Sequence, residues 1–145
     1  MRLQNLIISI IFIILLASCQ KDNNSVANEL SGLWTLTVNE RDGIEQWNQD
    51  VTVQLEFFNI ENGSGEVREH YYYVGSQGLH EGTFSANEDF SKITVHMNTP
   101  NNGTEHWDVD VNIVNSKLIL DGYNYVSMPQ FNFGYNYQIR KEGVK

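Results

Sequence analysis

Cysteine is almost absent from this chain of 145 residues, which carries only one, Cys19. A single cysteine cannot form a disulfide within the chain, and it excludes every metal site that needs several thiolates. Basic residues are also scarce, with nine against 18 acidic ones. The acidic balance argues against binding to nucleic acid and against direct adsorption to anionic lipid.

The sequence also lacks the motifs that mark common enzyme classes. It contains no nucleophile elbow, no phosphate-binding loop, no metalloprotease helix and no plausible order of Ser, His and Asp. Its many carboxylates follow from the acidic composition, and none has a partner at a diagnostic spacing. We therefore expect a protein that is not an enzyme and that carries no cofactor.

One long apolar run is present, close to the start of the chain. Arg2 precedes it, and the run from Leu6 to Leu16 is interrupted only by Ser9. Such a run is too short to cross a bilayer stably and it ends in small residues, which is the layout of a secretory signal. After residue 18 no apolar run is long enough to be a second membrane segment.

The end of this run, Leu16-Ala17-Ser18-Cys19, resembles the bacterial lipoprotein signal, in which an aliphatic residue and two small residues precede a cysteine. The resemblance implies that residues 1–18 are a signal peptide and that lipid, including palmitate, is attached at Cys19. Two acyl chains suffice for lasting attachment to a membrane. An ordinary signal peptide followed by a stray cysteine is the alternative.

The mature chain would have 127 residues and a net charge of −10, because Arg2 leaves with the signal. That length suits one domain with its own core. Residues 19–29 are polar, which predicts a lipidated, flexible tether. Residues 20–24 resemble the charged export signal of some Bacteroidota lipoproteins, which implies a place on the outer membrane, facing the cell exterior. A solvated spacer is the alternative.

From Leu30 to the end of the chain, apolar residues recur with a period of two. Trp34, Leu36 and Val38, for example, alternate with threonines. No window shows a sustained helical period, and β-branched and aromatic residues dominate. The pattern predicts eight strands, near residues 34–38, 51–57, 65–74, 79–86, 93–97, 107–113, 117–121 and 131–139.

Short connections between these strands predict antiparallel pairing in a meander. Closing the meander into a barrel removes the exposed edges that invite aggregation. We therefore predict an all-β fold, an eight-stranded antiparallel up-and-down barrel over residues 30–145. A barrel of this size either is filled by side chains or holds one small ligand, and the sequence leaves both states open.

Gly32-Leu33-Trp34, at the start of the first strand, resembles the Gly-x-Trp motif of lipocalin-like barrels. In that family a helical turn precedes the motif, here residues 26–30. The resemblance implies that Trp34 closes one end of the barrel and packs against a cation from the last strand. Arg140 and Lys141 are the two candidates, and parity places Lys141 inside. The chain looks closest to small lipocalin-like lipoproteins of Bacteroidota.

Polar side chains on the third and fourth predicted strands form a candidate ligand site. One parity places Arg68, His70 and Tyr72 inside the barrel, together with His80 and Phe84. Arg68 would then bind a carboxylate head group in an apolar cup. The other parity, which we favour slightly, leaves the polar set in solvent and turns inward the residues Val67, Tyr71, Tyr73 and Leu79.

Aromatic residues complete the candidate site, although such side chains more often belong to a core. The full set predicted to bind ligand is Arg68, His70, Tyr72, Phe84, Trp107 and Tyr135. The set predicted to close the barrel is Gly32, Trp34, Arg140 and Lys141.

Two histidines are predicted to meet across a turn at residues 100–103, which would bring His96 close to His106. With Asp108 and Asp110 on the same face, they are candidates for a zinc-like ion and a metal-assisted enzyme. A solvated outer face with ordinary cross-strand polar pairs is the alternative, and we favour it, so that no metal site is predicted.

Taken together, these patterns predict a lipid-anchored barrel that holds a small apolar or amphipathic molecule and releases it without bond chemistry. The alternative is a filled barrel whose acidic, aromatic exterior contacts a protein partner at the cell surface.

Overall fold

The computed structural model describes residues 23–46, 51–99, 103–131 and 133–145. The predicted signal peptide and the lipidation of Cys19 lie outside the described residues. The helices are α2 (Asn23–Leu30) and the short 3-10 helix η2 (Pro129–Phe131). The strands are β1 (Gly32–Arg41), β2 (Ile44–Glu45), β3 (Val51–Glu61), β4 (Ser64–Tyr73), β5 (Ser76–Ala86), β6 (Lys92–Thr99), β7 (Gly103–Val114), β8 (Lys117–Met128) and β9 (Phe133–Val144).

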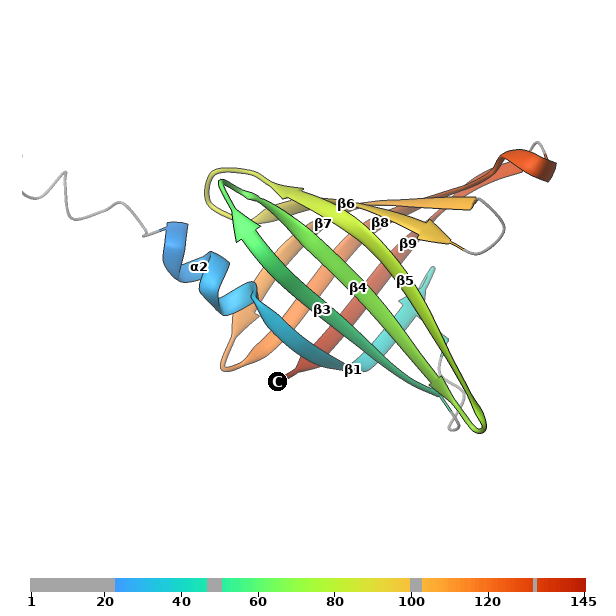
Figure 1. Cartoon of the computed structure of the whole chain (residues 1–145), viewed down its shortest axis with the longest axis horizontal. Coiled ribbons are helices and arrows are strands. Elements are labelled where there is room, and N and C mark those ends of the chain that lie inside the picture. The colour runs from blue at the N-terminus through green and yellow to red at the C-terminus, as the bar shows by residue number, and fades with distance from the viewer. Residues whose placement is uncertain (1–22, 47–50, 100–102, 132) are drawn as a thin grey trace, which may run out of the picture.

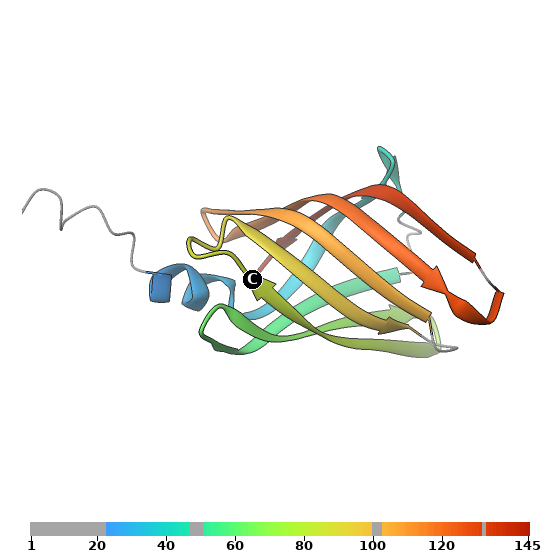
Figure 2. The same cartoon turned by 90° about the horizontal axis from the view of Figure 1, so that it is seen from above.

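These strands form one antiparallel sheet in chain order, closed by pairing of β1 with β9 (Figures 1 and 2). The two-residue strand β2 pairs only with the end of β1, so the other eight, longer strands make the barrel wall. The predicted eight-stranded antiparallel up-and-down barrel is confirmed. Most strands are longer than predicted. β8, for example, continues to Met128, seven residues past its predicted end at Asp121.

The period of two places one face of each strand in the lumen. On β3, Val53, Leu55 and Phe57 are buried, whereas the residues between them are less buried. On β7 the same alternation buries Trp107 and Val109. The core of the protein is therefore the inside of the barrel.

Two glycines allow neighbouring strands to approach closely. A Cβ atom at Gly82 would lie 1.9 Å from the carbonyl oxygen of His96, and one at Gly122 would lie 2.2 Å from that of Asp108. Glycine in a strand interior permits such contact between backbones where a sheet bends sharply. The curvature of the wall at β5–β6 and β7–β8 thus depends on glycine.

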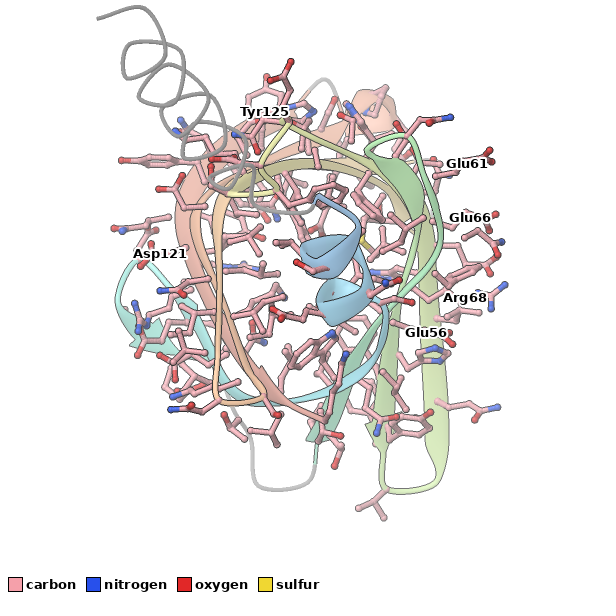
Figure 3. The ribbon with its side chains drawn as sticks, turned by 90° about the vertical axis from the view of Figure 1, so that its left-hand side faces the viewer. Glu56, Glu61, Glu66, Arg68, Asp121 and Tyr125 are labelled. Carbon is pink, nitrogen blue, oxygen red and sulfur yellow. The ribbon has the colours of Figure 1, made fainter. Side chains whose placement is uncertain are left out.

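One end of the barrel is closed by α2, which lies in front of the ring of strands in Figure 3. Val26 and Leu30 of this helix are buried, and the Trp34 indole nitrogen donates a hydrogen bond of 2.8 Å to the Leu30 carbonyl. The predicted helical turn at 26–30 is therefore present and longer than expected. Residues 23–29, which fall within the tether predicted for residues 19–29, belong to this helix, and Val26 and Leu30 pack it on the barrel.

The cation beside Trp34 is Lys145, whose Nζ lies 4.5 Å from the ring centroid and donates to the carbonyls of Glu29 and Ser31. The prediction that Arg140 or Lys141 plays this part is wrong. Because β9 continues to Val144, which pairs with Thr35, only the end of the strand reaches the level of Trp34, and Lys141 and Arg140 lie opposite Asn39 and Glu40. Arg140 points outward, where it pairs with Asp121 at 2.9 Å.

No helix within the described ranges has the length and the apolar character needed to cross a membrane.

Candidate functional site: a polar pocket inside the barrel

Large apolar side chains fill the lumen on the side of α2. Fully buried members of this core are Leu30, Trp34, Val53, Leu55, Phe57, Val67, Ile93, Met97, Trp107, Leu118 and Leu120. Phe84 also belongs to this core, with its ring 5.4 Å from Phe57 in an edge-to-face arrangement. On this side of the barrel the lumen is therefore filled by side chains.

Toward the end opposite α2 the lumen turns polar and contains a cavity of about 120 Å³, which we call the inner pocket. It is lined by residues from β1, β4, β7, β8 and β9, together with Gln46. The lining residues are Asn39, Glu40, Arg41, Gln46, Glu69, Tyr71, Glu105, Asn124, Tyr137, Ile139 and Lys141.

One wall of the inner pocket is a buried ion pair. Lys141 Nζ lies 2.7 Å from Glu69 Oε1, and the two side chains are 8% and 1% exposed. The same ammonium donates a hydrogen bond of 3.2 Å to Asn39 Oδ1 and lies 4.9 Å from the centre of the Trp107 ring. A buried ion pair is tolerated when further hydrogen bonds of this kind satisfy both partners.

The other oxygen of Glu69 accepts a hydrogen bond from the Tyr71 hydroxyl. Burial and the charge of Glu69 raise the pKa of Tyr71, so this hydroxyl stays protonated and keeps donating. His80, on β5 opposite Glu69, packs edge-on against the Tyr71 ring at 4.9 Å. Its Nδ1 is buried without a hydrogen bond to any described residue and lies 3.9 Å from Glu69 Oε2.

A second network crosses the pocket from β7 to β9. Glu105 Oε2 accepts from the Trp107 indole at 3.0 Å and from Asn124 Nδ2 at 2.7 Å. The Tyr137 hydroxyl accepts from Asn124 Nδ2 at 2.7 Å and from Arg41 Nη2 at 3.0 Å. Burial, followed by the charge of Glu105, raises the pKa of Tyr137. Its hydroxyl proton is therefore retained at neutral pH.

Asn124 leaves one polar atom unused. The residue is only 2% exposed, yet its Oδ1 has no hydrogen-bond partner among the described residues. The amide cannot simply be reversed, because the carboxylate of Glu105 accepts hydrogen bonds and needs the amide nitrogen opposite it. A buried acceptor without a partner is costly, so its presence on the wall of a cavity is a sign of a ligand.

The predicted ligand residues Arg68, His70 and Tyr72 do not reach this pocket. Arg68 pairs on the outer surface with Glu81 at 2.8 Å and with Glu56 at 3.7 Å, and Figure 3 shows its side chain pointing away from the barrel. His70 and Tyr72 lie on the same face, stacked with ring centroids 6.3 Å apart. The parity that placed these three residues in the lumen is therefore wrong.

The opposite parity is right for part of its set. Val67 and Tyr71 point inward, but Tyr73 and Leu79 are about half exposed. The turn between β4 and β5 contains only two residues, so that Tyr73 pairs with Ser76 and Leu79 falls opposite His70 on the outer face. The longer turn expected at residues 75–78 would have given a different register.

The remaining predicted ligand residues lie inside the barrel. Phe84 is part of the core, and Trp107 is buried behind the pocket with its indole nitrogen on Glu105. Tyr135 is half-buried and stacks on Tyr137, with 5.6 Å between the ring centroids. Sequence reasoning missed Glu69, Glu105 and Asn124. A signal was available for Glu69, which stands between Val67 and Tyr71 on the inward face.

The predicted meeting of His96 and His106 is present on the outer face of β6 and β7. Their Nδ1 atoms lie 3.1 Å apart, and His106 Nε2 lies 3.1 Å from Asp108 Oδ2. A hydrogen bond from Thr94 lowers the pKa of Asp108 below its usual range. Asp110 lies further along and pairs with Lys92 at 3.4 Å. Within the described ranges, no group of three His, Cys, Asp or Glu residues is placed to hold a metal ion.

Comparisons with known proteins identify the fold. No family model matches the sequence, and no curated protein is similar to it. Among solved structures the chain is similar to a redesigned β-barrel, b11L5F_LGL, with a TM-score of 0.58 and 12% identity over 82% of this chain and 93% of that one.

Two further barrels of the same kind are similar to it. One is the redesigned barrel mFAP1 bound to DFHBI, with a TM-score of 0.55 and 10% identity over 82% of this chain and 97% of that one. The other is EF1p2_mFAP2b bound to DFHBI, with the same TM-score and identity over 82% and 95% of the two chains. The chain therefore has the fold of a small antiparallel β-barrel.

Proposed function

We propose that this protein is a lipid-anchored barrel that binds the head of a small amphipathic molecule in the inner pocket. The observation that carries the proposal is a cavity of about 120 Å³ whose lining includes Asn124, a residue with a carbonyl oxygen that has no partner among the described residues. A ligand that donates a hydrogen bond there would satisfy an acceptor that the protein leaves unmet.

The size of the pocket limits what it encloses. Pockets for drug-sized ligands are usually about 300–1,000 Å³, whereas a cavity of about 150 Å³ accommodates benzene. The inner pocket therefore suits a group no larger than a small ring, with the rest of the molecule extending toward the barrel end. A long apolar chain has no space in the filled half of the lumen, so an amphipathic ligand is favoured over a purely apolar one.

Two arguments support the direction of entry. The core and α2 occupy one end of the barrel, so a ligand reaches the pocket from the opposite end. Only three residues separate Cys19 from the start of α2 at Asn23, and an extended residue spans about 3.5 Å. A lipid on Cys19 would thus hold the α2 end near the membrane and leave the pocket end facing away from it.

Similarity in fold lends further support, because two barrels like this one are bound to DFHBI. An eight-stranded barrel is wide enough to hold one small ligand. The proposal that no bond chemistry accompanies binding depends on the sequence, which lacks the motifs of common enzyme classes.

Binding can be tested with a panel of amphipathic molecules that differ in head group, using the mature protein. We expect Asn124→Ser to weaken the tightest binder about tenfold, because it removes the unpartnered acceptor. Asn136→Ser, on the outer face of β9, is the matched control and should leave affinity unchanged. The proposal fails if no member of the panel binds, or if both substitutions weaken binding equally.

The anchor is tested separately by growth with labelled palmitate. We expect label on the mature protein and none on a Cys19→Ala variant. Absence of label from the unmodified protein would contradict the anchor and leave the ligand proposal in place.

A second candidate function is that of an interaction module with no small ligand. The filled half of the lumen favours it, as do the exposed aromatic residues on the outside of β8, Tyr123 and Tyr125, which are 63% and 54% exposed. This candidate predicts that every small molecule fails to bind and that replacing both tyrosines abolishes binding to a protein partner.

A further inference from the structure

We infer that the inner pocket selects a cationic head group that donates hydrogen bonds, such as an ammonium or amidinium group. This inference depends on the proposed function, because it names the class of ligand for the same pocket. It differs from the sequence-based expectation, in which Arg68 would have bound a carboxylate.

The first step is the charge of the lining. Glu69 and Glu105 place carboxylates on the pocket wall, beside the cations of Arg41 and Lys141, whereas Glu40 is the cross-strand partner of the outward-facing Arg140. These four charges balance in number, so selectivity depends on which of them are already paired.

The second step is that both cations are already engaged. Lys141 is bonded to Glu69 and Asn39. Arg41 lies over the Tyr137 ring, with 4.0 Å from Cζ to the centroid, and donates to its hydroxyl. An anionic ligand would compete with Glu69 for Lys141, or would bind Arg41, an exposed cation that forms no ion pair with any described residue.

The third step is the position of Glu105. Its carboxylate accepts hydrogen bonds only from neutral groups, the indole of Trp107 and the amide of Asn124. Among the described residues no cation lies within ion-pair distance of it. Glu105 is half-buried, so its charge is only partly solvated, and a cationic ligand would supply the partner that it lacks.

The fourth step joins Glu105 to the unpartnered oxygen of Asn124. The Asn124 amide nitrogen donates to Glu105 Oε2 at 2.7 Å, so the two groups lie side by side on the wall. Both accept hydrogen bonds. An ammonium group offers three donors and no acceptor, whereas a carboxylate offers only acceptors and would meet repulsion from both.

The test uses three probes of similar size on the mature protein: benzylamine, benzyl alcohol and benzoate at neutral pH. The reporter is the indole N–H resonance of Trp107, because this group is bonded directly to Glu105. The signal is assigned by its loss in Trp107→Phe. We expect benzylamine to bind at least about tenfold more tightly than benzyl alcohol and benzoate to bind most weakly.

Two variants then test whether Glu105 causes the preference for a cationic probe. Glu105→Gln removes the charge at nearly constant size, and we expect it to reduce the advantage of benzylamine over benzyl alcohol about tenfold. The matched control is Glu66→Gln on the outer face, where Figure 3 shows the Glu66 side chain pointing into solvent. That variant should keep the preference intact.

The outcomes separate the inference from the proposed function. Equal or tighter binding of benzoate would overturn the inference and leave the pocket as a ligand site of other specificity. Binding of no probe, whatever its charge, would contradict the proposed function as well. Because the comparison of probes uses the unmodified protein, it remains decisive even if Glu105→Gln fails to fold.

Discussion

Lys141 Nζ lies 2.7 Å from Glu69 Oε1 inside the barrel, next to the apolar core. The pair joins β9 to β4, which are not neighbours in the sheet, across the lumen. It therefore links opposite walls of the barrel at the boundary between the apolar core and the inner pocket.

Removing one partner of this pair should be strongly destabilising. We expect Lys141→Met to lower the free energy of unfolding by about 3–5 kcal/mol, because it leaves the charge of Glu69 buried and unpaired. The measurement is urea unfolding at neutral pH. Lys92→Met is the matched control, because the Lys92–Asp110 pair is about 70% exposed and should contribute less than about 1 kcal/mol. Equal losses in both variants would contradict this prediction.

The helix α2 is expected to be part of the folded domain. Leu30, the last residue of this helix, is fully buried, so we expect Leu30→Ala to cost about 2–5 kcal/mol of unfolding free energy. Leu33→Ala, at a side chain that is 45% exposed, serves for comparison and should cost far less. A Leu30→Ala variant with unchanged stability would show that residues 23–30 do not pack on the barrel in solution.

The close contact between β5 and β6 at Gly82 should not accommodate a side chain without a loss of stability. We expect Gly82→Ala to destabilise the protein by about 1–3 kcal/mol, since the added Cβ meets the His96 carbonyl at 1.9 Å and one strand must shift. Gly78→Ala on the same strand is the control, because its Cβ would make only an ordinary contact of 3.7 Å with Tyr71. Thermal unfolding of the two variants distinguishes them.

Stability should fall in acid partly through Glu142. Hydrogen bonds from Lys117 and Arg140 lower the pKa of this nearly buried carboxyl group below its usual range. A carboxyl whose pKa is lowered by folding stabilises the protein above its unfolded pKa, and that stabilisation is lost as the pH falls through the folded pKa.

We therefore expect Glu142→Gln to lower the free energy of unfolding at pH 7 by roughly 1–2 kcal/mol. We also expect the variant to lose less stability than the unmodified protein between pH 5 and more acidic conditions. Urea unfolding over this range provides the measurement, and identical pH profiles for the two proteins would refute the assignment.

The barrel could be predicted from the sequence because most strands have one clearly apolar face. Val53, Leu55 and Phe57 show which face is buried without any knowledge of the partner strand. The closed meander follows from short connections and from the cost of free edges. These are local signals, and a single chain carries them.

The inner pocket could not be predicted, because its members are polar residues on inward faces. In the sequence, Asn124 and Glu105 resemble solvent-facing side chains. Only the register of β7 and β8 shows that they lie beside each other. Tyr73 pairs with Ser76, so odd-numbered residues of β4 share a face with even-numbered residues of β5, and the sequence does not show where this turn lies. A shift of one residue turns every side chain to the opposite face, so no periodicity argument resolves it.

The hydrogen bonds from Lys145 to the carbonyls of Glu29 and Ser31 fasten the last described residue beside the first helix. A label attached at Lys145 would consequently lie at the end of the barrel that α2 closes. The inner pocket, toward the other end, would stay unobstructed. Lys145 is therefore a suitable point at which to immobilise the protein for binding measurements.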